Sequence, residues 1–382
     1  MKEELFFMPL GGAQKVGASC YYLKLGNANI LLDAGIGIKD NLIFEPNLYS
    51  LKTSPFIESL SQINQVFISH AHADHIGYLL KLMKDANKAS VYMTKITELL
   101  TKYQLYDKNF LMNQKKTEES RLAAQSILDN IINVTYMKPI NFKNYKITFF
   151  PAGHIPGAMM MLFEIGKRKI LYTGDYSITN TPLTKGCFIP ENYGIDTIIM
   201  CGLHAKHPDY IRKSNNLYKT INYIYKSIQI GKSILCEVSQ LSKGIEFIKA
   251  LTDSNQTHVP IYIDTSMLPI IEKMEQLSIP ILNIDTHIKN DTRPTKPHIY
   301  ITSNNKNYDS QQYESIKVDF SLHEDFSEME TFIKRINPKH VFLVHCSKSN
   351  SKQDYTIEQK IMYDSECRTQ FTFAEENTIY KL

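Results

Sequence analysis

The chain has 382 residues, 43% of them hydrophobic and 21% charged, which is typical of a soluble globular protein and excludes a disordered chain. Lys and Arg outnumber Asp and Glu by 43 to 39, and the pI of about 8.5 permits a nucleic-acid partner without requiring one. At ~150 residues per domain, the length predicts two or three domains.

The membrane and the secretory pathway are not expected environments. No apolar run approaches the ~18 residues of a membrane-spanning helix. The opening segment, residues 1–9, is too short and too acidic for a signal peptide. The six cysteines are scattered and form no Cys-x-x-Cys pair, which favours reduced thiols over a disulfide framework. We therefore expect a cytoplasmic protein with no membrane association.

Short strands and helices alternate along the first half of the chain. Runs rich in β-formers predict strands at residues 20–25, 30–33, 66–69, 146–150, 159–165, 169–172 and 197–200. Apolar residues at helical spacing predict helices at residues 76–84, 96–106 and 118–131.

From about Leu203 the pattern changes to strand–helix alternation, which indicates a separate α/β domain. Strands are expected at residues 233–238, 261–263 and 298–301, helices at 218–230, 243–251 and 268–277, and a polar loop at 285–297. A last group comprises a strand at 316–320, a helix at 325–336 and a strand at 341–344. The predicted organisation is one domain, residues 1–202 and 313–382, interrupted by an inserted domain at 203–312.

The strongest chemical feature is the His70–His75 segment, which reads His-Ala-His-Ala-Asp-His. Its four candidate metal ligands, His70, His72, Asp74 and His75, lie between an expected strand and an expected helix. Imidazole and carboxylate together suit Zn²⁺ and its neighbours in the first transition row. Adjacent residues in one tight turn cannot all reach a single ion, so two pairs serving two ions is the more natural geometry.

Single polar residues also follow several apolar strands. They are Asp33, His154, Asp175, His323 and His345. Strand ends are where sheet scaffolds present functional groups on loops. Taken singly, such a residue is more often a cap or a surface residue. Taken together beside the His70–His75 segment, they complete two coordination spheres.

This order of residues resembles the metallo-β-lactamase superfamily, and more closely its β-CASP branch. That branch of nucleases includes ribonuclease J and the endonuclease of the mRNA cleavage and polyadenylation machinery. Residues 9–20, 152–159 and 171–177 are similar to its motifs, and His323 and His345 fall where its motifs B and C are expected. The resemblance implies an α/β fold, the αββα metallo-β-lactamase sandwich, with an inserted α/β β-CASP domain.

The resemblance also implies roles for the residues of the site. His70, His72 and His154 would hold one zinc ion, Asp74, His75 and His345 the second, and Asp175 would bridge both. Asp33 would orient the ligands through hydrogen bonds. His323 would act at the scissile phosphate as a general acid or a transition-state donor, so that Asp74, Asp175 and His323 are the expected catalytic residues.

The expected activity is a dizinc phosphodiesterase that hydrolyses RNA as an endonuclease, a 5′-exonuclease or both. Two ions ~3.5–4 Å apart can hold a bridging hydroxide that attacks the scissile phosphate. A histidine at motif C, here His345, is the choice of the RNA-processing members. The expected partner is single-stranded RNA, and a homodimer or an assembly with RNA-processing proteins is compatible with the sequence. The ligand set would also accept Mn²⁺ or Fe²⁺.

Two features leave alternatives open. Ser242 and Lys243 could hold a substrate phosphate at the start of a helix, or Ser242 could simply cap that helix. Cys201 stands where the branch has the acidic residue of its motif A, so that no carboxylate is expected to hold His323. The alternative functions are therefore a non-catalytic or weakly active RNA-processing subunit that retains the fold, and a nuclease acting on DNA.

Overall fold

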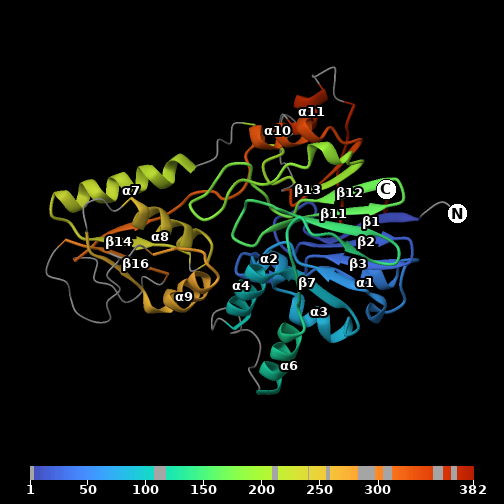
Figure 1. Ribbon diagram of the computed structural model, residues 1–382, viewed down its shortest axis with the longest axis horizontal. Coiled ribbons are helices and arrows are strands. Elements are labelled where there is room, and N and C mark those ends of the chain that lie inside the picture. Colours follow the sequence, from blue (N-terminus) through green and yellow to red (C-terminus); the bar gives the residue numbers. More distant parts are fainter. Residues whose placement is uncertain are drawn as a thin grey trace. The chain divides into compact units, whose positions relative to one another are not determined.

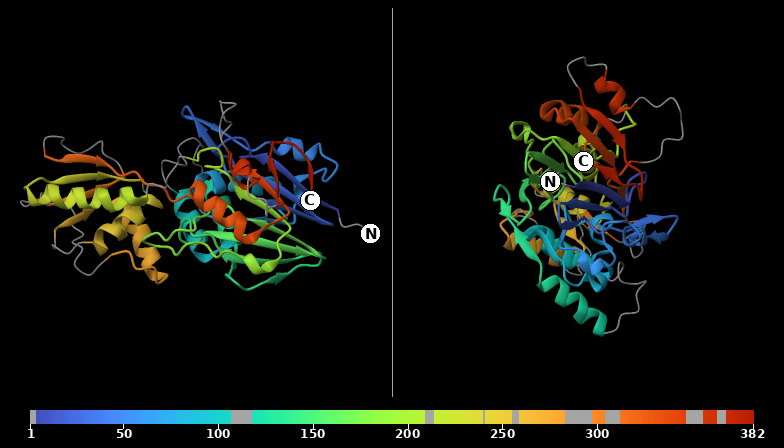
Figure 2. Two further views of the ribbon diagram at one scale, coloured as in Figure 1. Left: turned by 90° about the horizontal axis from the view of Figure 1, so that it is seen from above. Right: turned by 90° about the vertical axis from the view of Figure 1, so that its right-hand side faces the viewer.

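The protein is described by a computed structural model, which covers residues 4–106, 118–208, 214–239, 241–254, 259–282, 297–303, 312–346, 356–362 and 368–382. The chain forms two compact units. The first unit contains Met1–Thr179, Gly186–Ile211 and His323–Leu382, and the second contains Asn180–Lys185 and Arg212–Leu322. Figures 1 and 2 show both units coloured along the chain. The second unit is thus an insertion into the first, as the sequence predicts.

The first unit contains two seven-stranded sheets. One has the strand order β20-β1-β2-β3-β6-β7-β8. Its strands are β1 (Leu5–Gly11), β2 (Cys20–Leu25), β3 (Ala28–Leu32), β6 (Gln65–Phe67), β7 (Ser90–Thr94), β8 (Ile132–Val134) and β20 (Tyr380–Lys381). A small hairpin of β4 (Gly37–Lys39) and β5 (Leu42–Phe44) follows β3 in the chain.

The other sheet has the order β19-β18-β13-β12-β11-β10-β9. Its strands are β9 (Ile140–Asn141), β10 (Lys146–Pro151), β11 (Met159–Ile165), β12 (Arg168–Tyr172), β13 (Thr197–Cys201), β18 (His340–Val344) and β19 (Gln370–Phe373). β12, β13, β18 and β19 are mutually parallel, so their first residues meet at one edge of the sheet and their last residues at the other. This polarity separates two chemically different regions of the molecule.

Large apolar side chains fill the space between the two sheets. Phe67 of the first sheet packs edge-on against Phe163 of the second, with ring centroids 5.8 Å apart. Phe7 and Phe342 make a similar contact at 5.4 Å. Each of these four side chains is at most 1% exposed, and burying one Phe contributes roughly 1.5–3 kcal/mol. This core joins the two sheets into a sandwich.

Helices cover the sandwich on both sides, as Figure 1 shows for α3 and α4 beyond one sheet and α10 beyond the other. The helices of this unit are α1 (Leu48–Lys52), η1 (Leu60–Gln62), α2 (Ala73–Ile76), α3 (Leu79–Asp85), α4 (Lys95–Tyr106), α6 (Glu118–Asp129), η2 (Glu191–Tyr193), α10 (Phe326–Ile336) and α11 (Ile357–Met362). The expected αββα sandwich is therefore confirmed. In the part of the chain that the structure covers, no helix combines the length and the hydrophobicity of a membrane span.

The single helix expected at residues 76–84 is instead two helices. α2 ends at Gly77, whose N–H donates to Ala73 O. The next amide, Tyr78 N–H, donates to Ala34 O at 2.7 Å, outside the helix. The backbone thus turns toward the segment after β3 before α3 begins, a tertiary contact that helical spacing cannot reveal.

The second unit is built on a four-stranded parallel sheet of order β15-β16-β14-β17. Its elements are α7 (Ser214–Gln229), β14 (Ile234–Glu237), α8 (Lys243–Asp253), β15 (Ile261–Ile263), η3 (Thr265–Met267), α9 (Leu268–Gln276), β16 (Ile299–Thr302) and β17 (Glu314–Lys317). The inserted α/β domain is confirmed. Almost all of the loop expected at 285–297 lies outside the described residues.

The limits of the insertion differ from the expected 203 and 312. Strand β17 pairs in parallel with β14, so the last strand of the insertion lies beyond residue 312 and the compact unit ends at Leu322. The strand expected at 316–320 is accordingly shifted toward the N-terminus and belongs to the second unit. Which sheet a short strand joins depends on the edge available to it, and β17 takes the free edge of β14.

Candidate metal centre

Asp175 is the common element of the candidate site. It follows β12 by way of Gly174, which has a φ of +55° and whose Cβ would lie 2.6 Å from Ser69 Cβ. Its Oδ2 lies 3.5 Å from His75 Nε2, 3.7 Å from His70 Nε2 and 3.9 Å from His154 Nε2. Only a glycine fits before Asp175, and the resulting turn brings its carboxylate among three imidazoles.

One group of four potential ligands surrounds this carboxylate. It comprises His70, His72, His154 and Asp175, whose ligand atoms all lie within 4.8 Å of one another. His72 Nδ1 is 3.0 Å from His70 Nε2 and 3.1 Å from His154 Nε2. His72 occupies the N-cap position of α2, yet its side chain does not cap the helix. The three imidazoles converge from the β6–α2 connection, the N-cap of α2 and the β10–β11 connection.

The second group comprises Asp74, His75 and His345, again within 4.8 Å of one another. Asp74 Oδ2 lies 3.8 Å from His75 Nε2 and 3.7 Å from His345 Nε2. His345 follows β18 with a φ of +56°, a conformation that costs energy for any residue except glycine. Its N–H donates to Gly12 O at 2.7 Å, and this bond holds the strained residue in place.

The turn that carries the His70–His75 segment is fixed by backbone hydrogen bonds from two other segments. Ser19 N–H donates to Asp74 O and Ala34 N–H donates to His75 O. A Cβ at Gly35 would lie 1.6 Å from Asp74 O, so only glycine allows this approach. These hydrogen bonds and the close packing at Gly35 hold the ligand-bearing turn in one conformation, which fixes the positions of the potential ligands.

Asp33 lies behind His75, completely buried and with a φ of +60°. Its carboxylate accepts bonds from Ser69 N–H at 2.6 Å, Ser69 Oγ at 2.8 Å and Tyr172 OH at 2.5 Å. Its Oδ2 is also 2.7 Å from His75 Nδ1. Asp33 thereby fixes the ring orientation of His75 and leaves Nε2 directed at Asp175 and Asp74.

The charges of the cluster are strongly coupled. Burial disfavours the ionised form of Asp175, but the neighbouring imidazoles, His75 foremost, outweigh it and hold the pKa of this carboxyl well below its usual range. Burial likewise opposes the charge on His75, but Asp175 and Asp33 raise its pKa well above the usual value. Burial and the adjacent His75 lower the pKa of His70.

A metal cation fits this donor set. Among the described residues, His75 Nε2 and both carboxylate oxygens of Asp175 are buried and have no hydrogen-bond partner. Leaving such atoms unsatisfied costs roughly 1–3 kcal/mol each, more when the group is charged. Imidazole nitrogens and carboxylate oxygens are the ligands that zinc and its neighbours accept. Binding a cation would satisfy these atoms.

His323 belongs to a third group, with Asp175 and Cys201. Its Nδ1 lies 3.7 Å from Asp175 Oδ2, and its side chain is 22% exposed, whereas that of His70 is fully buried. Burial lowers the pKa of His323 in spite of Asp175. Asp175 thus faces His323 from beyond hydrogen-bond distance, and Cys201 lies in the same group, in the position where motif A has an acidic residue.

A further carboxylate of the site, that of Glu324, was not predicted from the sequence. Glu324 is completely buried, its two carboxylate oxygens have no hydrogen-bond partner among the described residues, and its backbone N–H donates to Tyr176 O. Burial, followed by Asp175, raises its pKa well above the usual value, and the Cys201 thiol partly opposes this. Cys201 thus has a carboxylate beside it, supplied by the residue after His323. An acidic residue flanking a candidate histidine was the only available signal.

The two expected phosphate contacts lie in the second unit. Ser242 has a φ of +51° and occupies the N-cap position of α8, but its side chain makes no capping hydrogen bond. Lys243 Nζ lies 3.4 Å from Asp319 Oδ1. A Cβ at Gly244 would lie 2.0 Å from Ser239 O, which explains the glycine there. The role of Ser242 and Lys243 toward phosphate stays a prediction.

Two family models match the chain. The model of the metallo-beta-lactamase superfamily matches residues 14–196, and that of the Zn-dependent metallo-hydrolase RNA specificity domain matches residues 312–353. The two matches include every residue of the candidate metal centre except Cys201. The chain therefore contains a metallo-β-lactamase domain and an RNA specificity domain, which confirms its resemblance to the β-CASP branch of the metallo-β-lactamase superfamily.

Curated relatives with ribonuclease names share about two thirds of this chain. The Endoribonuclease ysh1 of Aspergillus fumigatus is 28% identical over 68% of this chain and 30% of its own length. RNase aCSPSF2 of Saccharolobus solfataricus is 29% identical over 70% of this chain and 52% of its own. The Probable RNase MJ4 of Methanocaldococcus jannaschii is 30% identical over 69% and 60%. The chain thus spans only about a third to three fifths of these relatives.

A solved structure resembles the whole chain. It is that of a protein of unknown function from Enterococcus faecalis V583, with a TM-score of 0.70. The match covers 99% of this chain and all of that one at 13% sequence identity. The likeness concerns the fold alone.

Proposed function

We propose that this protein is a ribonuclease that hydrolyses phosphodiester bonds of single-stranded RNA with two zinc ions. The observation that carries the proposal is the convergence of two ligand groups on Asp175. One group is His70, His72 and His154, and the other is Asp74, His75 and His345. The match to an RNA specificity domain and the ribonuclease names of three relatives support RNA as the substrate.

Each ligand group would hold one ion, and Asp175 would contact both. The chemistry that two bound cations supply is Lewis-acid stabilisation of phosphoryl charge and activation of water. Asp74 and Asp175 contribute negative charge that retains the cations in a buried site. Asp33 keeps the His75 ring in one orientation, and its bonds from Ser69 and Tyr172 keep its own carboxylate in place.

His323 would donate a proton or a hydrogen bond to the departing ribose oxygen. It is more exposed than His70 and His154, so a substrate can reach it, and Asp175 lies 3.7 Å from its Nδ1. A positioned imidazole of this kind contributes typically ~10²–10⁴-fold to a reaction rate. Asp74, Asp175 and His323 are thus the residues proposed to act directly in cleavage.

Cleavage of a 5′-labelled single-stranded RNA by zinc-loaded protein tests the proposal, with Asp175→Ala as the control. Internal fragments would show an endonuclease, and release of the 5′-terminal nucleotide would show a 5′-exonuclease. Metal analysis should find two zinc ions per chain in the wild type and fewer in the variant. Intact RNA in the presence of both ions would contradict the proposal.

Two alternative functions are separated by the same assay. A DNA oligonucleotide of matched sequence, cleaved faster than the RNA, would show a nuclease acting on DNA. Tight RNA binding without cleavage in the zinc-loaded protein would show an RNA-binding subunit. A cytoplasmic location, and a homodimer or an assembly with RNA-processing proteins, stay predictions.

A further inference from the structure

A cavity of about 310 Å³ lies at the edge of the second sheet that is opposite the candidate metal centre. Arg168, Thr197 and His340, the first residues of β12, β13 and β18, line it. Asp175 and His345 follow the other ends of β12 and β18. Because each of these strands has five residues at ~3.3 Å per residue, about 16 Å separate the two regions. The cavity is therefore not part of the metal cluster.

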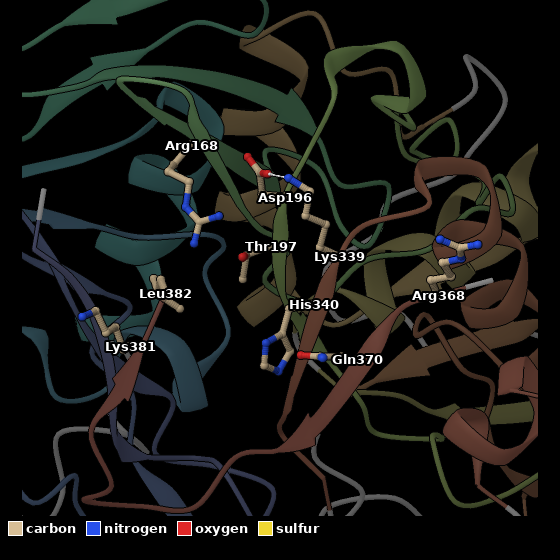
Figure 3. Close-up of a pocket in the computed structure, with 9 residues that line it drawn as sticks. All are labelled: Arg168, Asp196, Thr197, Lys339, His340, Arg368, Gln370, Lys381 and Leu382. Atoms are coloured by element: carbon tan, nitrogen blue, oxygen red, sulfur yellow. Dashed lines mark hydrogen bonds and ion pairs between the residues drawn. The ribbon is translucent and has the colours of Figure 1, made fainter. Parts of the chain in front are cut away.

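Cations surround this cavity. Arg168, Lys339, Arg368 and Lys381 line it together with a single acidic side chain, Asp196. Figure 3 shows Arg168 and Lys381 on one side and Arg368 on the other. Arg168, Lys339 and Arg368 lie at or just before the first residues of parallel strands of the second sheet, which begin at the same edge. Lys381 comes from β20 of the first sheet.

Only one of these four cations is neutralised. Asp196 accepts a bond from Lys339 Nζ at 2.6 Å, and its other oxygen accepts one from Lys169 N–H. Arg168, Arg368 and Lys381 make no side-chain ion pair or hydrogen bond with any residue that the structure describes. By contrast, Arg335 binds both oxygens of Glu191. Three unpaired cations around one cavity create a local positive potential that an anion would neutralise.

The chemistry of the lining favours phosphate. Two guanidinium groups offer planar, paired N–H donors that match phosphate oxygens, and the Lys381 ammonium adds a point charge. The volume lies at the lower end of the ~300–1,000 Å³ of small-molecule pockets, so a nucleotide unit fits and a folded protein segment does not. The His340 ring at its floor stacks on Phe342, with centroids 4.2 Å apart, and bonds Thr372 Oγ1, so it is held rigidly.

We propose that the cavity between Arg168, Arg368 and Lys381 binds phosphate esters, and that the phosphates come from the backbone of an RNA strand whose distant part is cleaved at the metal centre. The identification of the strand as RNA rests on the proposed function. The strands between the two regions are largely buried, so an RNA that contacts both must pass around the surface over more than about 16 Å, which favours a long RNA. The cavity then raises the affinity for long substrates and leaves the chemistry at Asp175 unchanged.

The main test is equilibrium binding of a labelled single-stranded RNA of ~30 nucleotides to the full chain in chelating buffer, which prevents cleavage. Each lost phosphate contact should reduce the slope of log affinity against log salt by ~0.7. The variant Arg168→Ala/Arg368→Ala should therefore bind roughly 3- to 30-fold more weakly, with a slope lower by ~1.4. Lys84→Ala/Lys88→Ala removes the same charge elsewhere on the first unit and should change neither.

Two further experiments distinguish free nucleotides from the RNA backbone as the source of phosphate, and distinguish failure of the cavity proposal from failure of the proposed function. If AMP stabilises the wild type but not the double variant, and RNA binding is unchanged, the cavity binds free nucleotides and the backbone assignment is overturned. If neither ligand distinguishes the double variant from the wild type, the cavity proposal fails. In the zinc-loaded protein, the double variant should raise KM for long RNA and leave cleavage of a short RNA unchanged. Failure of the wild type to cleave any RNA contradicts the proposed function alone.

Discussion

The two ends of strands β12 and β18 present opposite chemistry on one scaffold. Past their last residues lie Asp175 and His345, which are at most 2% exposed. At their first residues lie Arg168, which is exposed, and His340, which is half-buried. Among the described residues, burial at one end leaves carboxylate and imidazole atoms without partners, and at the other end cations without partners face an open cavity.

One sheet can thus carry a proposed cation site and a proposed anion site whose charges do not neutralise each other. Buried charges interact strongly because the local dielectric is low, whereas exposed charges are screened over ~8–10 Å. The strand length of about 16 Å exceeds that screening length. The metal centre is therefore expected to respond steeply to single substitutions, and the opposite edge weakly and in a salt-dependent way.

The largest expected difference is between two histidines of β18. His345→Ala removes a potential ligand that faces Asp74, and RNA cleavage should fall by at least ~10³-fold with loss of bound zinc. His340→Ala, at the other end of the strand, should leave cleavage of a short RNA unchanged. Single-turnover rates and metal analysis of both variants check this. Equal losses of cleavage rate in the two variants would contradict the expected difference between the two ends of β18.

His323→Gln should reduce cleavage by roughly 10²-fold or more while both zinc ions stay bound. The reason is that His323 faces Asp175 from a partly exposed position, where it can reach a leaving oxygen. Cleavage rates are measured beside the zinc content of the purified variant. A loss of one zinc ion would instead identify His323 as a ligand, together with Asp175 and Cys201.

Asp33→Asn should weaken metal affinity or cleavage by about 10- to 100-fold, because it removes the charge that orients His75. Tyr172→Phe deletes only one of the bonds to Asp33 and should have a smaller effect in the same direction. Zinc titration with a competing chelator measures both affinities. If Tyr172→Phe were the more damaging change, the sandwich core and not the carboxylate would be what fixes His75.

The smallest expected effect concerns stability at Glu324. Its pKa is raised in the folded protein, so the unfolded chain releases the proton first, and stability falls as the pH rises above the ordinary value of 4.5. Glu324→Gln cannot lose a proton there. In metal-free protein, the Tm of the variant relative to the wild type should increase from pH 5 to pH 8 by an amount on the order of a few °C. A difference in Tm that is constant with pH would contradict the raised pKa.

Much of the candidate site could be predicted from the sequence because its signal is local. The spacing of His70, His72, Asp74 and His75 between a strand and a helix indicates a metal site on chemical grounds alone. The structure groups these residues with His154, Asp175 and His345 as the resemblance implies. Their roles as zinc ligands await the metal analysis.

Other parts of the site have no local signal. Ser69 and Tyr172 lie in ordinary strand-end positions, and only the fold directs their hydroxyl groups at Asp33. The partnerless carboxylate of Glu324 is likewise a consequence of burial by surrounding elements. The helix and strand patterns also did not predict the hydrogen bond from Tyr78 N–H to Ala34 O, which divides one expected helix into two.

Periodicity and residue type act over a few positions, so the sequence alone indicated the insertion and the chemistry of the ligand set. The αββα class was implied by the resemblance to the metallo-β-lactamase superfamily. Other features follow from the fold alone. They are the cations that meet at the far edge, the pairing of β17 with β14, and the buried carboxylates that lack partners among the described residues. Strand pairing and burial bring together residues that are far apart in the chain. A local sequence pattern therefore predicts neither the distance between two such side chains nor their solvent exposure.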